Sequence, residues 1–189
     1  MGWKKITVLL LLFIIIGCNT LFENYYRTED RGIRPKRSKF ELAEQAYHLI
    51  KKDMIDTSSV YIYQKETYRN ERKEIEEYFY RFFSNGKCIR GFSSDFKRNQ
   101  LTLSDFNNLA RGGSFIGYYK IESPLNLVTE TFSVGVGENG KYIKEYGIIK
   151  GDTIFLSDSP LINKEKIDDN NIEIYIKKKV EGLTGTPDW

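Results

Sequence analysis

The sequence is poor in the residues that bind metals and form cross-links. It has one histidine, His48, and two cysteines, Cys18 and Cys88, among 189 residues. A zinc site takes several His or Cys ligands, and nothing in the sequence matches a glycine-rich phosphate loop. His48 follows Glu44 by one helical turn, which is typical of a surface pair. We therefore expect no metal, no cofactor and no catalytic site.

The chain also lacks an apolar run long enough for a membrane-spanning helix. The run Ile6–Ile16 falls short of the ~20 residues that such a helix requires. It follows Lys4 and Lys5 and is followed by the small residue Gly17. A basic start, a short apolar stretch and a small residue together predict a secretory signal peptide over residues 1–17.

The end of this signal resembles the lipobox of bacterial lipoproteins. The matching tetrapeptide is Ile15-Ile16-Gly17-Cys18. The resemblance implies cleavage between Gly17 and Cys18, attachment of two or three acyl chains to Cys18, and a partner membrane. Asn19 stands where an Asp would favour the inner membrane in this family, so the resemblance favours the outer membrane over the inner one. The alternatives are an ordinary cleaved signal and an uncleaved signal anchor.

Cleavage would change the balance of charge and thiols in the mature chain. Loss of Lys4 and Lys5 lowers the formal net charge from +3 to +1, so we expect no nucleic-acid partner. Cys88 would be left without a second cysteine in the body of the domain, which excludes an intramolecular disulfide. We expect Cys88 to be a buried, inert thiol, with pairing to another chain as the alternative.

The segment after the lipobox predicts a tether and then a helix. Residues 18–37 have no clean period, and their basic part, residues 31–37, either contacts anionic head groups or is a solvated linker. Ser38 and Glu41 form a capping box that begins an amphipathic helix. The apolar stripe of that helix is Leu42, Ala43, Ala46, Leu49 and Ile50. The folded domain is predicted to cover residues 38–189.

From residue 59 the hydrophobic pattern alternates with period two, which is typical of strands. Eight strands are predicted, at residues 59–63, 77–83, 88–92, 114–122, 126–134, 141–149, 153–157 and 172–177. A short helical turn is expected at residues 104–110. Eight short strands joined by tight turns favour an antiparallel up-and-down barrel, which removes exposed sheet edges. A strongly curved open sheet is the alternative.

Two tight turns predict strand registers. A two-residue turn at Asn85-Gly86 would place Phe82 opposite Ile89, Phe83 opposite Cys88 and Arg81 opposite Arg90. Tyr78, Tyr80, Phe82 and Ile89 would then share the core face. A turn at Gly151-Asp152 would pair Ile149 with Ile154 and Gly147 with Leu156.

A second resemblance concerns the barrel itself. The segments Phe82–Lys87, Gly117–Ile121 and Tyr146–Ile154 and the ending Thr186–Trp189 are similar to small lipoproteins of the Bacteroidota with a lipocalin-like barrel. That resemblance covers roughly residues 57–189 and implies a lipocalin-like architecture.

Aromatic residues make up 14% of the chain and alternate along the predicted strands. They either line an amphipathic cavity or reflect the strand propensity of aromatic side chains. The candidate contact residues are Tyr78, Tyr80, Phe82, Tyr119 and Tyr146. Two functions stay open: a barrel that binds a small apolar or amphipathic ligand, and a module with a filled core that binds another envelope protein.

Overall fold

In a computed structural model of the chain, the structure describes residues 23–45, 47–51, 53–69, 72–93, 100–160 and 172–189. The predicted signal peptide and lipobox, with Gly17 and Cys18, lie outside these residues. Among them, no helix combines the length and the apolar character needed to cross a membrane.

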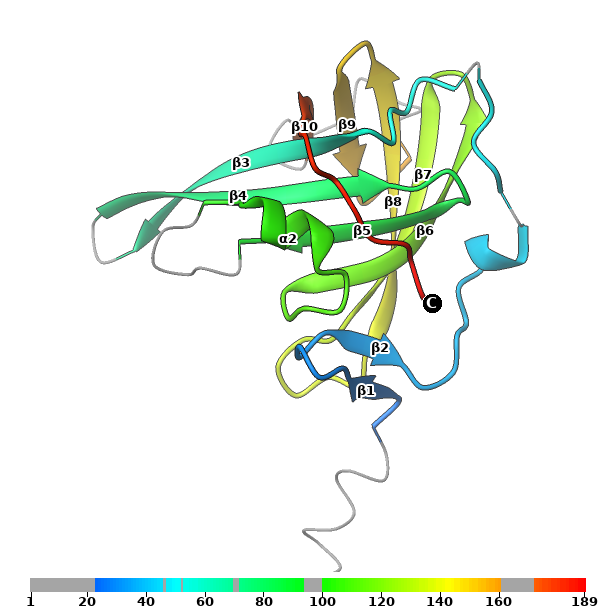
Figure 1. The fold of residues 1–189 in the computed structure, drawn as a ribbon. Helices are drawn as coiled ribbons and strands as arrows, with labels where there is room; N and C mark the ends of the chain where they lie inside the picture. Colours follow the sequence, from blue (N-terminus) through cyan, green and yellow to red (C-terminus); the bar gives the residue numbers. More distant parts are fainter. Residues whose placement is uncertain (1–22, 46, 52, 70–71, 94–99, 161–171) are drawn as a thin grey trace, which may run out of the picture.

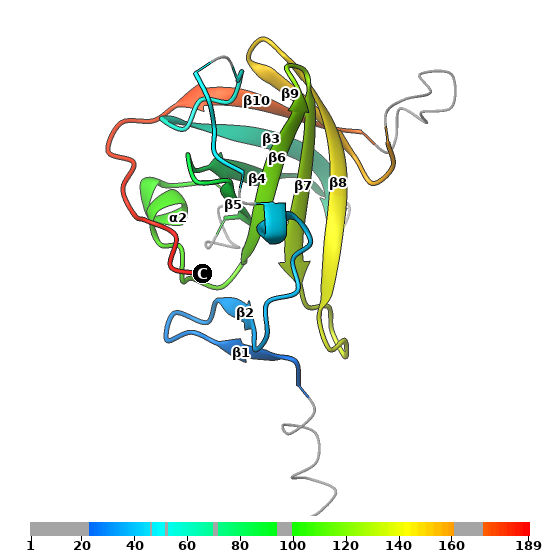
Figure 2. The ribbon, with the colours of Figure 1, turned by 90° about the vertical axis from the view of Figure 1, so that its right-hand side faces the viewer.

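Eight antiparallel strands form a closed barrel (Figures 1 and 2). Each strand pairs with its neighbour in the chain, and the last strand returns to pair with the first. The strands are β3 (Ser59–Arg69), β4 (Arg72–Phe82), β5 (Lys87–Phe92), β6 (Ser114–Ser123), β7 (Asn126–Ser133), β8 (Lys141–Lys150), β9 (Thr153–Ser157) and β10 (Glu173–Lys179). The predicted up-and-down barrel is therefore confirmed.

Part of the predicted tether belongs to the folded domain. The short strands β1 (Tyr25–Arg27) and β2 (Ile33–Pro35) form a hairpin, and Ile33 of β2 pairs in parallel with Phe115 of β6. The Arg34 side chain is buried and donates to the Leu109 carbonyl. Residues before Ser38 thus pack with the barrel, because these contacts fix residues whose local sequence has no strand period.

The predicted amphipathic helix is reduced to one short turn. A 3-10 helix, η1 (Leu42–Gln45), stands in its place. Its Leu42 N–H donates to the Glu130 carboxylate of β7 over 2.9 Å, and Phe40 is buried in an aromatic cluster with Tyr118 and Tyr142. Contacts with the outer barrel wall therefore replace the internal hydrogen bonds of a longer helix.

After η1 the chain closes one end of the barrel. Tyr47 and Leu49 pack with the interior cluster, in which Ile55 is buried. The Leu49 N–H donates to the Ser84 carbonyl in the turn between β4 and β5 over 2.9 Å. Residues 47–51 and 53–55 thus form a strap across this end, from which β3 continues into the barrel.

The register of β4 and β5 differs by one residue from the prediction. Phe82 pairs with Cys88 and Arg81 with Ile89. The turn has three residues, since the Phe83 N–H donates to the Lys87 carbonyl over 2.9 Å and Gly86 has a φ of 75°, a conformation that favours glycine. Arg81 therefore does not face Arg90, and Ile89 points to the outer side of the sheet instead of the interior.

The register of β8 and β9 agrees with the prediction. Ile149 pairs with Ile154 and Gly147 with Leu156, across a turn in which Gly151 has a φ of 58°. A two-residue turn with a glycine in the left-handed region fits the twist of a hairpin.

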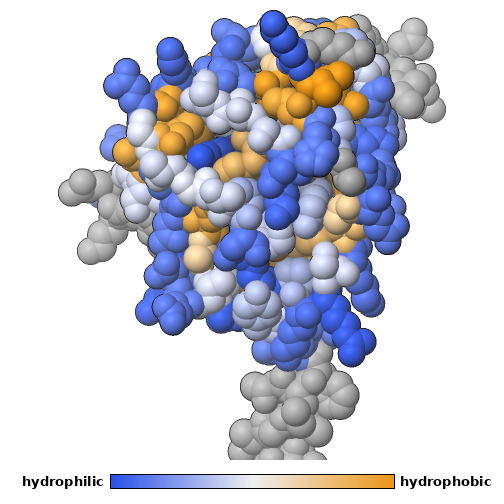
Figure 3. Space-filling view, turned by 45° about the vertical axis from the view of Figure 1, so that its right-hand side comes forward, coloured by the Kyte–Doolittle hydropathy of each residue, from blue (hydrophilic) through white to orange (hydrophobic). Residues whose placement is uncertain are grey.

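A second layer covers the outside of β4 and β5. Helix α2 (Leu103–Asn107) overlaps the helical turn predicted at residues 104–110, and the C-terminal tail runs beside it (Figure 1). Phe106 and Leu109 are buried there with Phe79 and Ile89. Arg81 donates to the Phe106 and Thr184 carbonyls at 3.0 and 2.6 Å, which joins the helix and the tail to the barrel. The face in Figure 3 is mostly hydrophilic, with hydrophobic side chains gathered in separate areas.

Candidate ligand cavity

The barrel interior is filled at one end and hollow at the other. Beside the strap, large side chains pack without exposure, among them Tyr61, Phe82, Tyr119 and Ile154. Toward the opposite end lies a cavity of about 360 Å³, at the small end of the range for ligand pockets. Its wall includes Tyr78, Arg90, Phe92, Phe115, Thr131 and Ile143.

Strand alternation places these side chains on one surface. In a strand, every second residue faces the same side of the sheet. Arg90 and Phe92 of β5 pair with Tyr80 and Tyr78 of β4, and Arg90 also pairs with Phe115 of β6. These residues all share the inward face with Cys88. The cavity is therefore a product of the observed register, and the predicted register would have turned Arg90 and Phe92 outward.

Aromatic rings line one side of the hollow half. The centroids of Tyr78 and Phe92 lie 6.3 Å apart, and those of Phe92 and Phe115 lie 6.2 Å apart. Tyr63 extends the series, with its ring centroid 6.1 Å from that of Tyr78 and 5.5 Å from that of Tyr175. Of these rings, those of Tyr78, Phe92 and Phe115 line the cavity, whereas Tyr175 is buried in the interior cluster with Tyr63 packed against it.

A guanidinium held by two carboxylates forms the polar floor of the cavity. Arg90 Nη2 donates to both oxygens of Glu173 at 2.8 and 2.7 Å, and Nη1 donates to Glu145 over 3.2 Å. The side chains of Arg90 and Glu145 keep only 18% and 9% of their exposure. The Nε of Arg90 is buried and has no hydrogen-bond partner among the described residues.

Burial and hydrogen bonding shift the acid–base equilibria of this floor. Burial raises the pKa of Glu145, while the Arg90 charge and the Tyr80 hydroxyl oppose that shift. The Tyr80 hydroxyl donates to Glu145 over 2.6 Å. Burial, followed by the hydrogen bond to Glu76, raises the pKa of Tyr78 to about 12. Both tyrosines are therefore neutral donors at pH 7.

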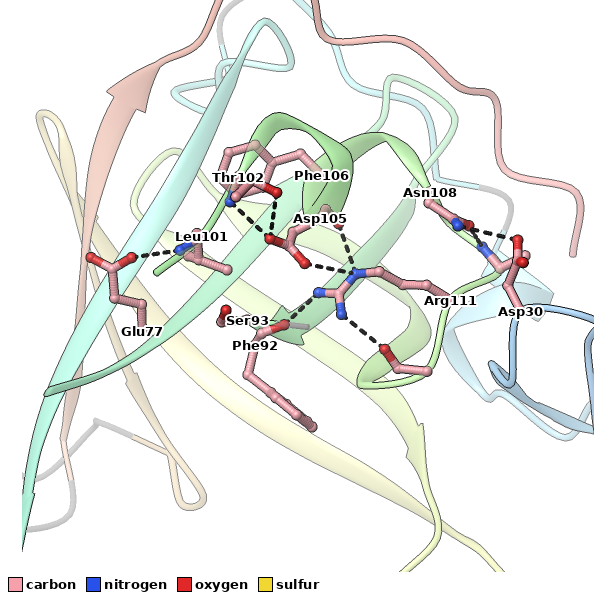
Figure 4. Close-up of polar contacts among 12 residues, drawn as sticks. Asp30, Glu77, Phe92, Ser93, Leu101, Thr102, Asp105, Phe106, Asn108 and Arg111 are labelled. Atoms are coloured by element: carbon pink, nitrogen blue, oxygen red, sulfur yellow. Dashed lines mark hydrogen bonds and ion pairs between the residues drawn. The ribbon is translucent and has the colours of Figure 1, made fainter. Parts of the chain in front are cut away.

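Contacts from the α2 segment hold the rim of the cavity (Figure 4). The Leu101 N–H donates to Glu77 over 2.9 Å, and the Arg111 guanidinium donates to the Phe92 carbonyl. Arg111 is itself fixed by its bonds to the Asp105 carbonyl and the Asp105 carboxylate, at 3.1 and 3.6 Å. Phe92 is thus held in place from outside the barrel wall.

The sequence-predicted contact residues lie in three different places. Tyr78 lines the cavity, and Tyr80 lies in its floor. Phe82 and Tyr119 are fully buried in the filled half. Tyr146 lies on the outer side, where it pairs with Val128 and contributes to a shallow hollow near Pro160. Gly17 and Cys18 lie outside the described residues.

Sequence reasoning missed the ionic floor. Arg90 and Glu145 are 55 residues apart and meet only when the barrel closes. The available signal was Arg90, an arginine that lies at an inward position between Cys88 and Phe92. The predicted hairpin register placed it on the outer face instead, so the floor was not recognised.

Two other residues with reactive side chains, Cys88 and His48, do not line the cavity. Cys88 is a buried free thiol, and burial raises its pKa well above the usual value. His48 is exposed. Within the described ranges, no three His, Cys, Asp or Glu side chains gather in a way that could hold a metal ion.

A second feature lies on the outer surface. Ile174 and Ile176 of β10 keep 44% and 59% of their exposure. Together with Ile62 they border an outer groove that also includes Gln64 and Lys178.

Comparisons with protein-family models, curated proteins and solved structures give no match for this chain.

Proposed function

We propose that the protein is a lipid-anchored envelope protein whose barrel binds a small amphipathic ligand. The cavity of about 360 Å³ in the open half of the barrel supports this proposal. Its aromatic wall suits an apolar group, and the Arg90–Glu145–Glu173 floor suits a polar one. A few polar groups that converge in a mostly apolar hollow are typical of small-molecule sites.

The anchor is proposed from the lipobox resemblance. Acylation of Cys18 would hold the barrel at the membrane, with the outer membrane favoured by Asn19. Each buried acyl CH₂ contributes about 0.8 kcal/mol, so two or three chains make the attachment permanent. The proposed role is binding near a membrane and not catalysis.

The outer apolar groove supports the second candidate, a protein-interaction module. Ile174 and Ile176 are exposed on one face, as at a protein contact. A filled barrel core would have favoured that candidate further. Because the open half is hollow, we place ligand binding first.

Two experiments test the proposal. Mass spectrometry of the native purified protein should detect a co-purifying small amphiphile; Ile143→Trp, which fills the cavity, should abolish that signal, whereas Ile174→Trp on the outer face should keep it. Equal signals in both variants, or none in the wild type, would count against the cavity. Cys18→Ala should prevent lipidation, and a variant that still carries acyl chains would contradict the lipobox interpretation.

A further inference from the structure

We propose that the end of the barrel that carries β1 and β2 docks on an anionic phospholipid surface. The docking surface is the exposed basic face of this end, which we call the basic end. Its cations are Arg27, Arg31, Lys36, Arg37 and Lys39. This inference rests on the proposed lipid anchor and adds the orientation that the barrel takes on the membrane.

The positive charge of the predicted mature chain is concentrated in one segment. Residues 23–39 contain six Lys and Arg against three Asp and Glu, whereas residues 40–189 contain 21 against 23. The segment beside the proposed anchor therefore carries a formal charge of +3, and the rest of the domain carries −2. An anionic surface attracts the first part and repels the second, which orients the domain.

The fold holds the exposed cations close to the start of the described chain. Glu23 is the first described residue, and the Lys36 N–H donates to the Asn24 carbonyl over 2.8 Å. Arg27 follows on the same strand, β1. Glu23 comes five residues after Cys18, and a chain of that length spans at most about 18 Å. An acylated Cys18 would therefore hold the basic end close to the lipid head groups.

The C-terminal tail does not cancel this charge. The cations of Arg34 and Lys87 lie 5.4 and 5.9 Å from the centroid of the Trp189 ring, and Asp188 interacts electrostatically with the buried Arg34. These two cations offset Asp188 and the terminal carboxylate. The acids of the segment that remain against its five exposed cations are Glu23, Glu29 and Asp30.

An exposed apolar tip lies beside the cations. Val136, in the turn between β7 and β8, is fully exposed and borders the same hollow as Tyr25 and Arg27. The carboxylate of Glu138 in this turn is paired with Lys141 over 3.2 Å. Basic residues around an exposed apolar side chain are typical of surfaces that lie in the membrane interface.

The cavity lies in the same half of the barrel. Phe115 of its wall pairs with Ile33 of β2, and two other wall residues, Ser133 and Ile143, lie next to the β7–β8 turn. The β8–β9 turn and β10 lie at the opposite end (Figures 1 and 2). Docking of the basic end would therefore bring the hollow half next to the bilayer, from which an amphipathic ligand could partition.

Vesicle co-sedimentation at pH 7 tests the docking. The protein is the chain from residue 19, which keeps every packed element between Tyr25 and Trp189 and carries no acyl group. It should bind vesicles of phosphatidylcholine and phosphatidylglycerol in equal parts at least about tenfold more tightly than vesicles of phosphatidylcholine alone. The preference should fall as added salt shortens the Debye length from roughly 30 to 8 Å. Equal binding to both kinds of vesicle would overturn the inference.

A triple variant locates the contact on the basic end. It combines Arg27→Gln, Lys36→Gln and Arg37→Gln. Each basic residue near an anionic surface contributes about fivefold to binding, so the variant should bind the anionic vesicles at least about tenfold more weakly.

A matched control removes the same charge from the strap end of the barrel. It combines Lys150→Gln, Lys178→Gln and Lys179→Gln, at three exposed lysines. Because these positions lie beyond a Debye length from a docked membrane, binding should change by less than about twofold. Thermal melts confirm that both variants are folded. Equal losses in the two variants would overturn the proposal, since the effect would then be one of overall charge.

A fluorescent label at the apolar tip reports the orientation. In the chain from residue 19 the remaining cysteine is the buried Cys88, so a maleimide dye attaches selectively at Val136→Cys. Its emission should shift to the blue on anionic vesicles, whereas a dye at Lys178→Cys should show no shift. A blue shift at Lys178→Cys alone would contradict the proposed orientation.

The outcomes separate this inference from the proposed function. Because the tested chain has no acyl group, a missing preference for anionic vesicles overturns the docking and leaves the acylation of Cys18 and the cavity to their own tests. Polyglutamate serves as a soluble competitor. If it binds the protein as tightly as the vesicles do, the basic end recognises an acidic polymer and the lipid assignment is wrong.

Discussion

Replacement of Arg90 by methionine tests the ionic floor of the cavity. Methionine retains much of the apolar stem but leaves Glu145 and Glu173 without their shared cation. The side chain of Glu145 keeps 9% of its exposure, whereas that of Glu173 keeps 31%. Most of the loss of folding stability should therefore come from Glu145, because water can still reach Glu173.

The size of the effect follows from the burial of the pair. Loss of one partner of a fully buried ion pair costs about 3–5 kcal/mol. Arg90 retains 18% of its exposure and the Tyr80 hydroxyl continues to donate to Glu145, so we expect about 2–3 kcal/mol. For a domain of this size that loss lowers the melting temperature by roughly 5–10 °C.

The loss should depend on pH with a definite sign. Burial already raises the pKa of Glu145, and removal of Arg90 raises it further. A carboxyl whose pKa is higher in the folded state than in the unfolded state binds more protons in the folded state. The loss of folding stability that it causes is therefore absent below the unfolded-state pKa and grows as the pH rises toward the folded-state pKa. The deficit of Arg90→Met should therefore be largest at pH 7 and shrink toward pH 4.5.

Urea titrations at pH 7 and 4.5, each against wild type, measure this deficit. Adding Glu145→Gln to Arg90→Met should restore more than half of the loss at pH 7, because the unpaired charge is gone. A deficit below about 1 kcal/mol, the range of exposed pairs, or one that does not change with pH, would refute the buried-floor account.

Three further predictions concern the barrel and its closed end. Gly117→Ala should destabilise the protein by about 3 kcal/mol, because a Cβ there would lie 2.3 Å from the Glu130 carbonyl oxygen. The control Gly137→Ala should destabilise it by about 1 kcal/mol, because Gly137 has a φ of 75° but open space around it. Equal losses of stability in denaturant titrations would contradict this prediction. Ile55→Ala should cost about 3 kcal/mol without changing ligand affinity, since Ile55 packs in the filled half, and a lost affinity in calorimetry would show that the two halves are coupled. Cys88 should resist Ellman's reagent at pH 8 until the protein unfolds, because burial keeps its thiol protonated; rapid labelling of the native protein would contradict its buried position.

The sequence predicted the strands and the closed barrel because period-two alternation is a local signal. The β8–β9 register was also predictable, since Gly151-Asp152 fits a two-residue turn without help from other elements. The β3 strand extends six residues beyond the predicted Tyr63, because the polar residues that follow pair with β4.

The register of β4 and β5 depends on contacts that are distant in sequence. Asn-Gly fits a turn of two or three residues, and the choice follows from what surrounds Gly86. A Cβ on Gly86 would lie 2.3 Å from the Tyr47 carbonyl oxygen, and the Gly86 carbonyl accepts from the Tyr119 N–H over 2.8 Å. Contacts with the strap and β6 thus fix the turn, and the local sequence pattern does not indicate these contacts.

The short helix and the ionic floor were not predicted, because both depend on contacts between residues that are distant in sequence. The capping box at Ser38 and Glu41 indicated a helix, but the Leu42 N–H donates to Glu130 on the outer face of the barrel wall. Arg90 and Glu145 come together only through the closure of the sheet.

The most direct test of the account is to locate the bound ligand by amide chemical-shift mapping with 1-octanol, a small neutral amphiphile. The account predicts saturable shifts at Tyr78, Phe92, Phe115 and Ile143 in the open half of the barrel. Shifts confined to the outer groove at Ile62, Ile174 and Ile176 would contradict it and favour the interaction module instead.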